Sequence, residues 1–187
     1  MAALTTAQLQ ALDEVSAKLG MNNPKWLEYL IQYETGGTFN PLEKNPLSSA
    51  RGLIQFMNST AKNMGYRDSL DLVEKHPEFI SQLKGPVYEY LKPYAPYKSE
   101  YELNMAVFFP AARKYSPSTS FESIYRDLYG GDWRKHYSRF QAGNPGINSP
   151  QDYMDRVKKN TGRVPVREIG GLVAIALAAW YFLRRKR

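Results

Sequence analysis

The chain has 187 residues, 43% of them hydrophobic and 23% charged, and this composition is typical of a folded protein and excludes a disordered one. Four of its positive charges lie in the last four residues, 184–187, so the rest of the chain is only weakly basic and nucleic acid is not expected as a partner. The absence of cysteine excludes disulfides and thiol catalysis. The two histidines, His76 and His136, lack the spacing of metal ligands, so neither a metal site nor a cofactor is expected.

The first part of the chain predicts two helices followed by a long loop. Thr5 and Gln8 match a capping box, which opens a helix that Gly20 ends. Asn23 is expected to cap the second helix, with Pro24 at its first position. The loop over 35–50 is rich in Gly, Thr, Asn, Pro and Ser, and a long ordered loop of this kind often carries function.

Short helices are predicted over much of the remaining chain. The segment 52–56 fits either an edge strand or the start of a helix. A helical pattern over 77–94 is interrupted at Gly85-Pro86, which predicts a kink or two helices. Ser99 and Glu102 match a capping box that opens a strongly apolar helix, which is expected in the centre of the core. Further helices are expected to begin at caps within 58–60 and end at Gly65, to span 68–74 and 121–129, and to begin at Ser149-Pro150. No long strand is visible, so the fold class is mainly α with at most a small β element.

Residues 169–183 form a stretch without a charge, which ends in aromatic residues and runs into the basic tail 184–187. As a helix this stretch spans roughly 22 Å, against a hydrocarbon core of ~30 Å, so local thinning or snorkelling of the flanking arginines has to close the gap. The aromatic end and the cations beyond it favour a transmembrane helix over the alternative, a buried core helix. Residues 163–168 then act as a hinge, and the N-terminus shows no secretory signal sequence.

Glu34 follows directly on the second predicted helix. At ~100° per residue it lies on the same face as Leu27, Leu30 and Ile31, the face expected to be buried. The glycines at 36 and 37 stop the helix there. Burial at the end of an apolar face raises the pKa of a carboxyl group and lets it act as a general acid. The alternative is a frayed last turn in which Glu34 faces water.

Two blocks of sequence then indicate a family. Glu34-Thr35-Gly36 with Phe39-Asn40-Pro41, and the run Ala50-Arg51-Gly52-Leu53-Ile54-Gln55-Phe56-Met57-Asn58-Ser59-Thr60-Ala61, resemble the signature blocks of lytic transglycosylase (SLT-type) domains. These domains are related to goose-type lysozyme and cleave the glycan strands of bacterial peptidoglycan. The resemblance implies a lysozyme-like SLT domain over 1–162, with peptidoglycan glycan strands as the substrate.

In that family a single glutamate, matched by Glu34, is the catalytic residue. It protonates the β-1,4 bond between N-acetylmuramic acid and N-acetylglucosamine, the substrate's acetamido group assists, and a 1,6-anhydro product forms. Activation of water instead would make the same site that of a lysozyme. That outcome needs a second carboxylate, for which Glu43, Asp68 and Asp71 are candidates; each also fits a solvated or capping acid.

The resemblance also suggests residues that contact the substrate. Gln55 and Met57 match positions that line the sugar cleft, although a loop-closing hydrogen bond explains Gln55 equally well and core packing explains Met57 better. Tyr153 lies in a segment that resembles the closing part of the domain, and packing is an equal alternative for it. The expected substrate-binding residues are Ser48, Ser49, Gly52, Gln55, Met57 and Tyr153.

One segment departs from the family. Ala106-Val107-Phe108-Phe109-Pro110-Ala111 stands where the family usually carries Ala-Tyr-Asn-Ala-Gly, so the polar pair is replaced by phenylalanine. The Phe-Phe-Pro-Ala form resembles variants in phage-encoded muralytic enzymes. Together with the absent secretory signal and the expected C-terminal anchor, this resemblance implies a phage enzyme, set in a virion membrane for genome entry or in the host inner membrane for lysis.

The positive-inside rule places the basic tail on the cytoplasmic side and the catalytic domain toward the periplasm and cell wall. In a virion membrane, other virion membrane proteins are further expected partners. Three alternatives remain at the level of sequence. The chain is then a lysozyme-type muramidase, a catalytically inactive peptidoglycan-binding virion protein, or a basic peripheral membrane protein without activity on the wall.

Overall fold

The computed structural model describes residues 3–163, and within them the chain is helical almost throughout, which confirms the mainly α class. The chain divides into two compact units, Met1–Phe108 and Phe109–Arg187, where the sequence predicts one domain over 1–162. The predicted transmembrane helix over 169–183, the basic tail and all of the hinge beyond residue 163 lie outside the described residues. Between residues 3 and 163, no helix is both long and apolar enough to span a bilayer.

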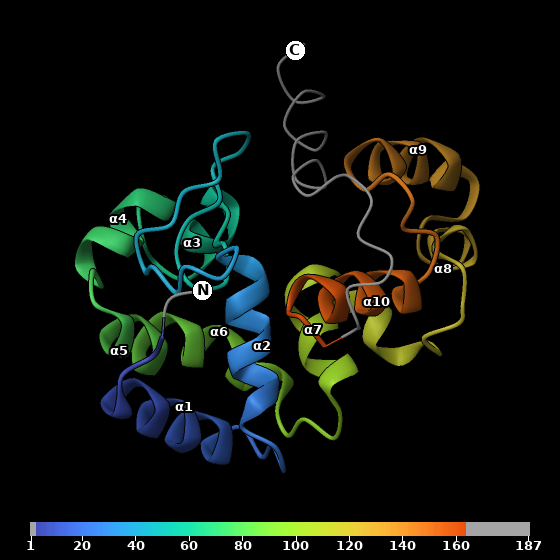
Figure 1. The fold of residues 1–187 in the computed structure, drawn as a ribbon. Helices are drawn as coiled ribbons and strands as arrows, with labels where there is room; N and C mark the ends of the chain where they lie inside the picture. The colour runs from blue at the N-terminus through green and yellow to red at the C-terminus, as the bar shows by residue number, and fades with distance from the viewer. Residues whose placement is uncertain (1–2, 164–187) are drawn as a thin grey trace. The chain divides into compact units, whose positions relative to one another are not determined.

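The first unit is built from short helices joined by tight turns (Figure 1). Helix α1 packs against α2 and α5, and α7 packs against α2 and α6. The helices of this unit are α1 (Thr6–Lys18), α2 (Lys25–Glu34), α3 (Asn58–Asn63), α4 (Ser69–Lys75), α5 (Phe79–Gln82), the π-helical turn η1 (Leu83–Val87), α6 (Tyr88–Leu91), the 3-10 turn η2 (Lys92–Tyr94) and α7 (Glu100–Phe108).

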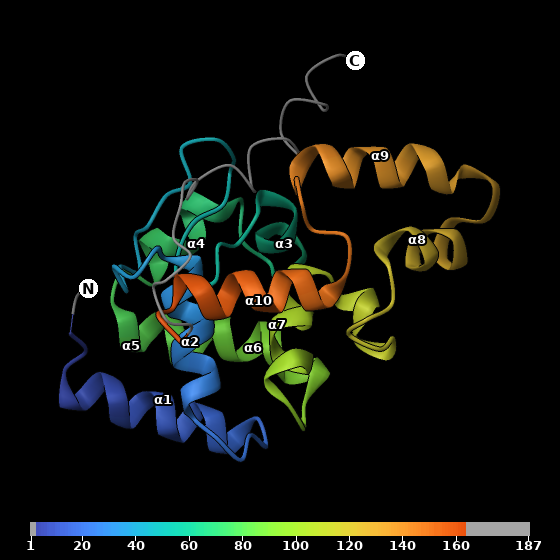
Figure 2. The same ribbon diagram turned by 45° about the vertical axis from the view of Figure 1, so that its right-hand side comes forward.

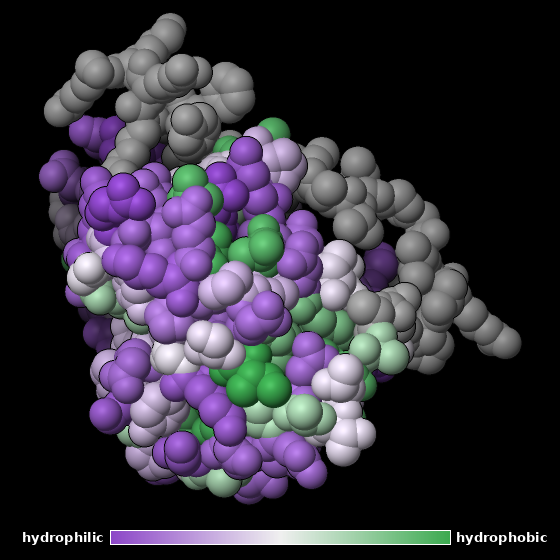
Figure 3. All heavy atoms as spheres, turned by 90° about the vertical axis from the view of Figure 1, so that its left-hand side faces the viewer, coloured by the Kyte–Doolittle hydropathy of each residue, from purple (hydrophilic) through white to green (hydrophobic). Residues whose placement is uncertain are grey.

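Leucine dominates the core of the first unit. Leu12 on α1, Leu27 and Leu30 on α2, and Leu83 and Leu91 beyond the long loop are almost completely buried. Burial of each such side chain is worth about 1.5–3 kcal/mol relative to exposure, so this cluster fixes α2 against its neighbours. Outside the core, most of the face drawn in Figure 3 is hydrophilic, and hydrophobic residues appear there as islands.

Most of the predicted caps are present. Thr5 and Gln8 form a complete capping box, and Asn23 accepts a hydrogen bond from the backbone N–H of Lys25 at 3.0 Å. Ser99 accepts from the N–H of Glu102 at 3.2 Å, but the Glu102 carboxylate reaches back to the N–H of Lys98. The start of α7 is therefore stabilised by a variant of the predicted box.

The predicted cap of α3 is wrong. No side chain within 58–60 caps this helix; instead the Ser49 hydroxyl accepts from the backbone N–H of Asn58 at 3.2 Å. The Asn58 side chain accepts hydrogen bonds from Ser69, the first residue of α4. The cap comes from the preceding loop, which local sequence does not reveal.

The predicted interruption at Gly85-Pro86 is a kink with a π-helical turn. Gly85 has φ −96° and ψ −107°, outside the helical region, and α5 and α6 continue on either side. Proline removes one backbone donor, and the wider turn accommodates the loss.

The second unit contains the 3-10 turn η3 (Pro110–Lys114), α8 (Phe121–Tyr129), the 3-10 turn η4 (Gly130–Asp132), α9 (Trp133–Gly143) and α10 (Pro150–Asn160). Helices α8 and α9 pack side by side and form a hairpin, joined by η4 (Figure 2). Helix α9 is not among the predicted elements, although Trp133, Tyr137 and Phe140 recur at helical spacing. Ser149 and Asp152 form a capping box at the start of α10, as Ser149-Pro150 predicts.

Candidate active site

Glu34 is the last residue of α2, and its side chain is half-buried. Leu27, Leu30 and Ile31 on the same helix are completely buried, so the apolar face leads directly to the carboxyl group. The helix stops because Gly36 and Gly37 adopt φ values of 59° and 83°, in the left-handed region that favours glycine. The last turn of the helix is therefore ordered rather than frayed.

A compact turn fixes the backbone that follows Glu34. The Thr35 hydroxyl donates to the carbonyl of Ile31 at 2.7 Å and accepts from the N–H of Phe39 at 3.1 Å. Phe39 has a positive φ of 54° and is 9% exposed, so its ring packs into the core despite a strained backbone. This packing ties the position of Glu34 to the core rather than to solvent-exposed loop residues.

Tyr90 on α6 contacts Phe56, and sequence reasoning missed it. Its ring meets Phe56 of the second block edge-on, with centroids 6.0 Å apart, and its hydroxyl donates to the carbonyl of Ala106 at 3.0 Å. Burial, the neighbouring Tyr94 and the charge of Glu34 together raise the pKa of Tyr90 to about 12. Tyr90 thus stays a neutral hydrogen-bond donor, and the charge of Glu34 contributes to its raised pKa.

The second block forms a small β element. Isolated antiparallel bridges join Lys44 to Arg51 and Arg51 to Phe56, and the chain turns between them. The N–H of Gly52 donates to the carbonyl of Glu43 at 2.9 Å, and this hydrogen bond closes the loop between residues 43 and 52. Segment 52–56 is therefore a bridged turn, rather than an extended edge strand or a helix start.

Gly52 is required by a close approach. Its φ is 84°, and a Cβ atom placed on it would lie 2.5 Å from Oε1 of Gln82. Gln82 is completely buried and accepts from the N–H of Leu53, while its Nε2 donates to the carbonyls of Pro41 and His76. One buried amide therefore fastens the candidate-site loop to α5, and sequence gave no signal for it beyond a glutamine within an apolar helix.

The structure separates the alternatives for Gln55 and Met57. Nε2 of Gln55 donates to the carbonyl of Gly52 at 3.0 Å, and the residue is 9% exposed with φ 53°. Its side chain therefore closes the loop, as the structural alternative predicts. Met57 is half-buried and does not belong to the hydrophobic core of the unit, so core packing does not explain it.

Ser48 and Ser49 have structural contacts. The Ser48 hydroxyl accepts from the N–H of Ala50 at 3.1 Å, and the Ser49 hydroxyl accepts from the N–H of Asn58. The Ser49 carbonyl also accepts from the hydroxyl of Ser69. These hydrogen bonds join the loop to α3 and α4.

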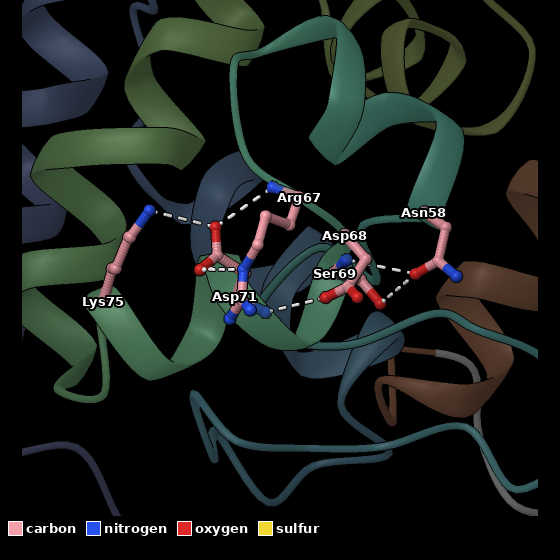
Figure 4. A network of polar contacts seen from close by, with 6 residues as sticks. All are labelled: Asn58, Arg67, Asp68, Ser69, Asp71 and Lys75. Atoms are coloured by element: carbon pink, nitrogen blue, oxygen red, sulfur yellow. Dashed lines mark hydrogen bonds and ion pairs between the residues drawn. The ribbon is translucent and has the colours of Figure 1, made fainter.

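The candidate second carboxylates differ sharply in their surroundings. Asp68 caps α4 by accepting from the N–H of Asp71 at 2.9 Å. Asp71 is 4% exposed and accepts from the Arg67 backbone, the Arg67 guanidinium and the Lys75 ammonium, each at 3.0 Å (Figure 4). The Arg67 N–H, followed by Lys75, lowers the pKa of Asp71 to about 2. Both aspartates therefore stabilise α4, Asp68 as its cap and Asp71 through its ion pairs.

Glu43 is the remaining candidate. Its carboxylate accepts from the Thr38 hydroxyl at 2.8 Å and is half-buried. Within residues 3–163 it forms no ion pair. Unlike Asp71, it keeps acceptor capacity that no cation satisfies.

Tyr153 and Phe109 belong to the second unit. Tyr153 on α10 is 2% exposed, which agrees with the packing alternative. The Phe109 ring stacks on Tyr125 with centroids 5.4 Å apart at 9°, and also contacts Phe121 and Phe140. This phenylalanine is part of an aromatic core.

Among residues 3–163 no three His, Asp or Glu side chains are grouped as metal ligands would be. Comparison of the chain with protein-family models, curated proteins and solved structures finds no match.

Proposed function

We propose that the chain is a peptidoglycan lytic transglycosylase in which Glu34 is the single acid/base. The observation that supports this proposal is that Tyr90, whose ring contacts Phe56 of the second block, lies near enough to Glu34 for the charge of that carboxylate to contribute to the raised pKa of Tyr90. The two blocks are separated in sequence, and Gln82 links them, because it accepts from the N–H of Leu53 in the second block and donates to the carbonyl of Pro41 in the first. The lysozyme-like SLT fold is part of the same proposal.

The position of Glu34 at a helix end is consistent with a general acid. The C-terminal end of a helix carries partial negative charge, which disfavours a carboxylate there. Tyr90 directs its proton to Ala106 rather than stabilising an anion, so the chemistry of general acid catalysis suits the position.

The reaction needs no second protein carboxylate. Glu34 donates its proton to the glycosidic oxygen as the bond from that oxygen to C1 of N-acetylmuramic acid breaks. The acetamido oxygen of the same sugar stabilises the positive charge at C1. The Glu34 carboxylate then removes the proton of the C6 hydroxyl, O6 bonds to C1, and Glu34 is protonated again. No water is consumed, and the product carries a 1,6-anhydro end.

Glu43 supports a second candidate, a muramidase on the same site. Because its carboxylate has the Thr38 hydroxyl as a partner and no cation among the described residues, it has the capacity to hold a water molecule. Deprotonation of that water by Glu43 and attack on C1 would give a reducing end. Asp71 does not offer this capacity, because Arg67 and Lys75 already occupy it, and Asp68 is engaged as the cap of α4.

Glu34→Gln tests the proposal. We expect loss of about 10²- to 10⁴-fold in the rate of glycan cleavage, the range that general acid catalysis contributes, with unchanged circular dichroism and unfolding temperature. Glu28→Gln, on the same helix and paired with exposed Lys25, is the matched control and should keep full activity. Equal activity of the Glu34→Gln variant and the parent would refute the assignment.

Mass analysis of the released muropeptides separates the two reactions. Anhydro ends support the transglycosylase and reducing ends the muramidase. Binding to peptidoglycan without any cleavage by the parent chain would instead indicate an inactive wall-binding protein. The proposed setting, a membrane-anchored phage enzyme, depends on the apolar stretch 169–183, which lies outside the described residues.

A further inference from the structure

The two units carry opposite net charge. Residues 1–108 contain ten Lys and Arg against twelve Asp and Glu, whereas residues 109–163 contain ten Lys and Arg against only five Asp and Glu. The described part of the second unit is therefore strongly basic for its size. Averaging over the whole chain hides this difference, because the acidic first unit offsets it.

Aromatic and cationic side chains gather at the turn between α8 and α9. Tyr129, the last residue of α8, is 40% exposed, and Trp133, the first residue of α9, is half-buried. The guanidinium of Arg126 lies 4.5 Å from the Trp133 ring centroid and that of Arg134 lies 4.8 Å from it. Both arginines are exposed; Arg126 also forms an ion pair with Glu122 at 2.5 Å, whereas Arg134 forms no ion pair among the described residues.

Aromatic contacts within the hairpin order Tyr129 at its surface. Tyr129 stacks on His136 with centroids 4.0 Å apart, and on Tyr125, which is buried against Phe140. Ordering the surface rings on such a base reduces the entropy lost on binding.

Trp and Tyr beside Arg are the residue types that anchor proteins at the level of lipid headgroups. A guanidinium over an indole ring can still bind phosphate with its edge, and for Arg126 the lipid phosphate has to compete with Glu122. We propose that the α8–α9 hairpin binds the surface of an anionic lipid membrane, with Trp133 and Tyr129 at headgroup depth and Arg126 and Arg134 on the lipid phosphates.

Two other anionic or planar ligands fit less well. Single-stranded nucleic acid and glycans use free aromatic faces for stacking. Guanidinium groups already lie over the Trp133 ring, and His136 lies on the Tyr129 ring. A headgroup layer needs no stacking partner, which favours the lipid surface.

The full chain with Trp133 as its only tryptophan (Trp26→Phe, Trp180→Phe) tests this contact directly. We expect vesicles of phosphatidylglycerol and phosphatidylcholine to shift Trp133 emission to shorter wavelength, and brominated lipid to quench it. Pure phosphatidylcholine should do neither. High salt should reverse the effect, because the Debye length falls from about 10 Å at 0.1 M to about 3 Å at 1 M. This readout remains specific for the hairpin even where another part of the chain holds the protein on the vesicle.

Removing two charges supplies the matched comparison. Because each basic residue near an anionic surface raises binding about fivefold, Arg126→Gln with Arg134→Gln should lower the salt concentration that halves the quenching. Lys62→Gln with Lys98→Gln removes the same two charges from the first unit. This variant should leave the salt concentration that halves the quenching unchanged. Trp133 that stays accessible to iodide on anionic vesicles, or that responds to oligonucleotides instead, would overturn the proposal. The proposed glycan cleavage is unaffected by either outcome, since the measurement does not use activity.

Discussion

At the scale of single residues, Glu34 and Glu43 distinguish the two proposed reactions, transglycosylation and hydrolysis. Glu34 ends an apolar helix face, whereas Glu43 lies in the following loop with a hydroxyl as its only described hydrogen-bond partner for the carboxylate. Transglycosylation requires the first and not the second, because the substrate supplies its own nucleophile. Hydrolysis by an inverting route requires both.

Glu43→Gln therefore separates the reactions. Under the transglycosylase proposal, the variant should cleave peptidoglycan at a rate within about threefold of the parent, since it loses no general acid/base step. Its products should keep anhydro ends. The measurement is the release of muropeptides followed by mass analysis. A loss as large as that of Glu34→Gln, with reducing ends from the parent, would favour the muramidase.

Gly52 gives a second prediction at this scale. Gly52→Ala combines a left-handed backbone, which costs about 1–2 kcal/mol for an L-residue, with overlap against Gln82, for which overpacking costs about 1–3 kcal/mol more. Gly65→Ala is the control, because Gly65 has φ 89° and open space around its Cβ position. Urea unfolding should show the larger loss of stability for Gly52→Ala. Equal losses would mean that Gln82 moves aside freely.

At the scale of elements, local sequence predicts helix ends better than it predicts what joins them. The capping box at Thr5 and the glycines after Glu34 act within a few residues, so the sequence pattern contains the whole cause. The cap of α3 comes instead from Ser49, nine residues before the N–H that it accepts, and Gln82 fastens a loop more than forty residues away at Pro41. Such contacts depend on tertiary packing.

Helix α4 carries a prediction about pH. Asp71 has an ordinary pKa of 3.8, and its Arg67 and Lys75 donors lower the value to about 2 in the folded chain. The stabilisation from the ionised group is therefore complete well above pH 3.8 and is lost as the pH falls toward 2. The difference in unfolding free energy between the parent and Asp71→Asn should be constant above about pH 5 and shrink between about pH 4 and 2. A difference independent of pH over that window would contradict the role of the ion pairs.

At the scale of the whole molecule, composition conceals the division into two units. The sequence shows one weakly basic body, but the charge is concentrated after residue 108. The aromatic residues divide as well: Phe109, Tyr125 and Phe140 form the interior of the second unit. Phe109 therefore belongs to a core, which explains physically why a phenylalanine is suited to a position where a polar residue was expected.

The final prediction concerns the stretch beyond the described residues. A chain that ends at Arg163 keeps Glu34, Tyr90 and the bridged turn of the second block, so it should cleave peptidoglycan at the rate of the full chain. It lacks the uncharged stretch 169–183 and the basic tail. After a high-salt wash, which weakens electrostatic contacts such as those proposed for the hairpin, the full chain should remain with the membrane fraction and the shortened chain should be released. Release of both chains would exclude an anchor in 169–183 while leaving the catalytic proposal standing, and loss of cleavage only in the shortened chain would show that the glycan site extends beyond residue 163.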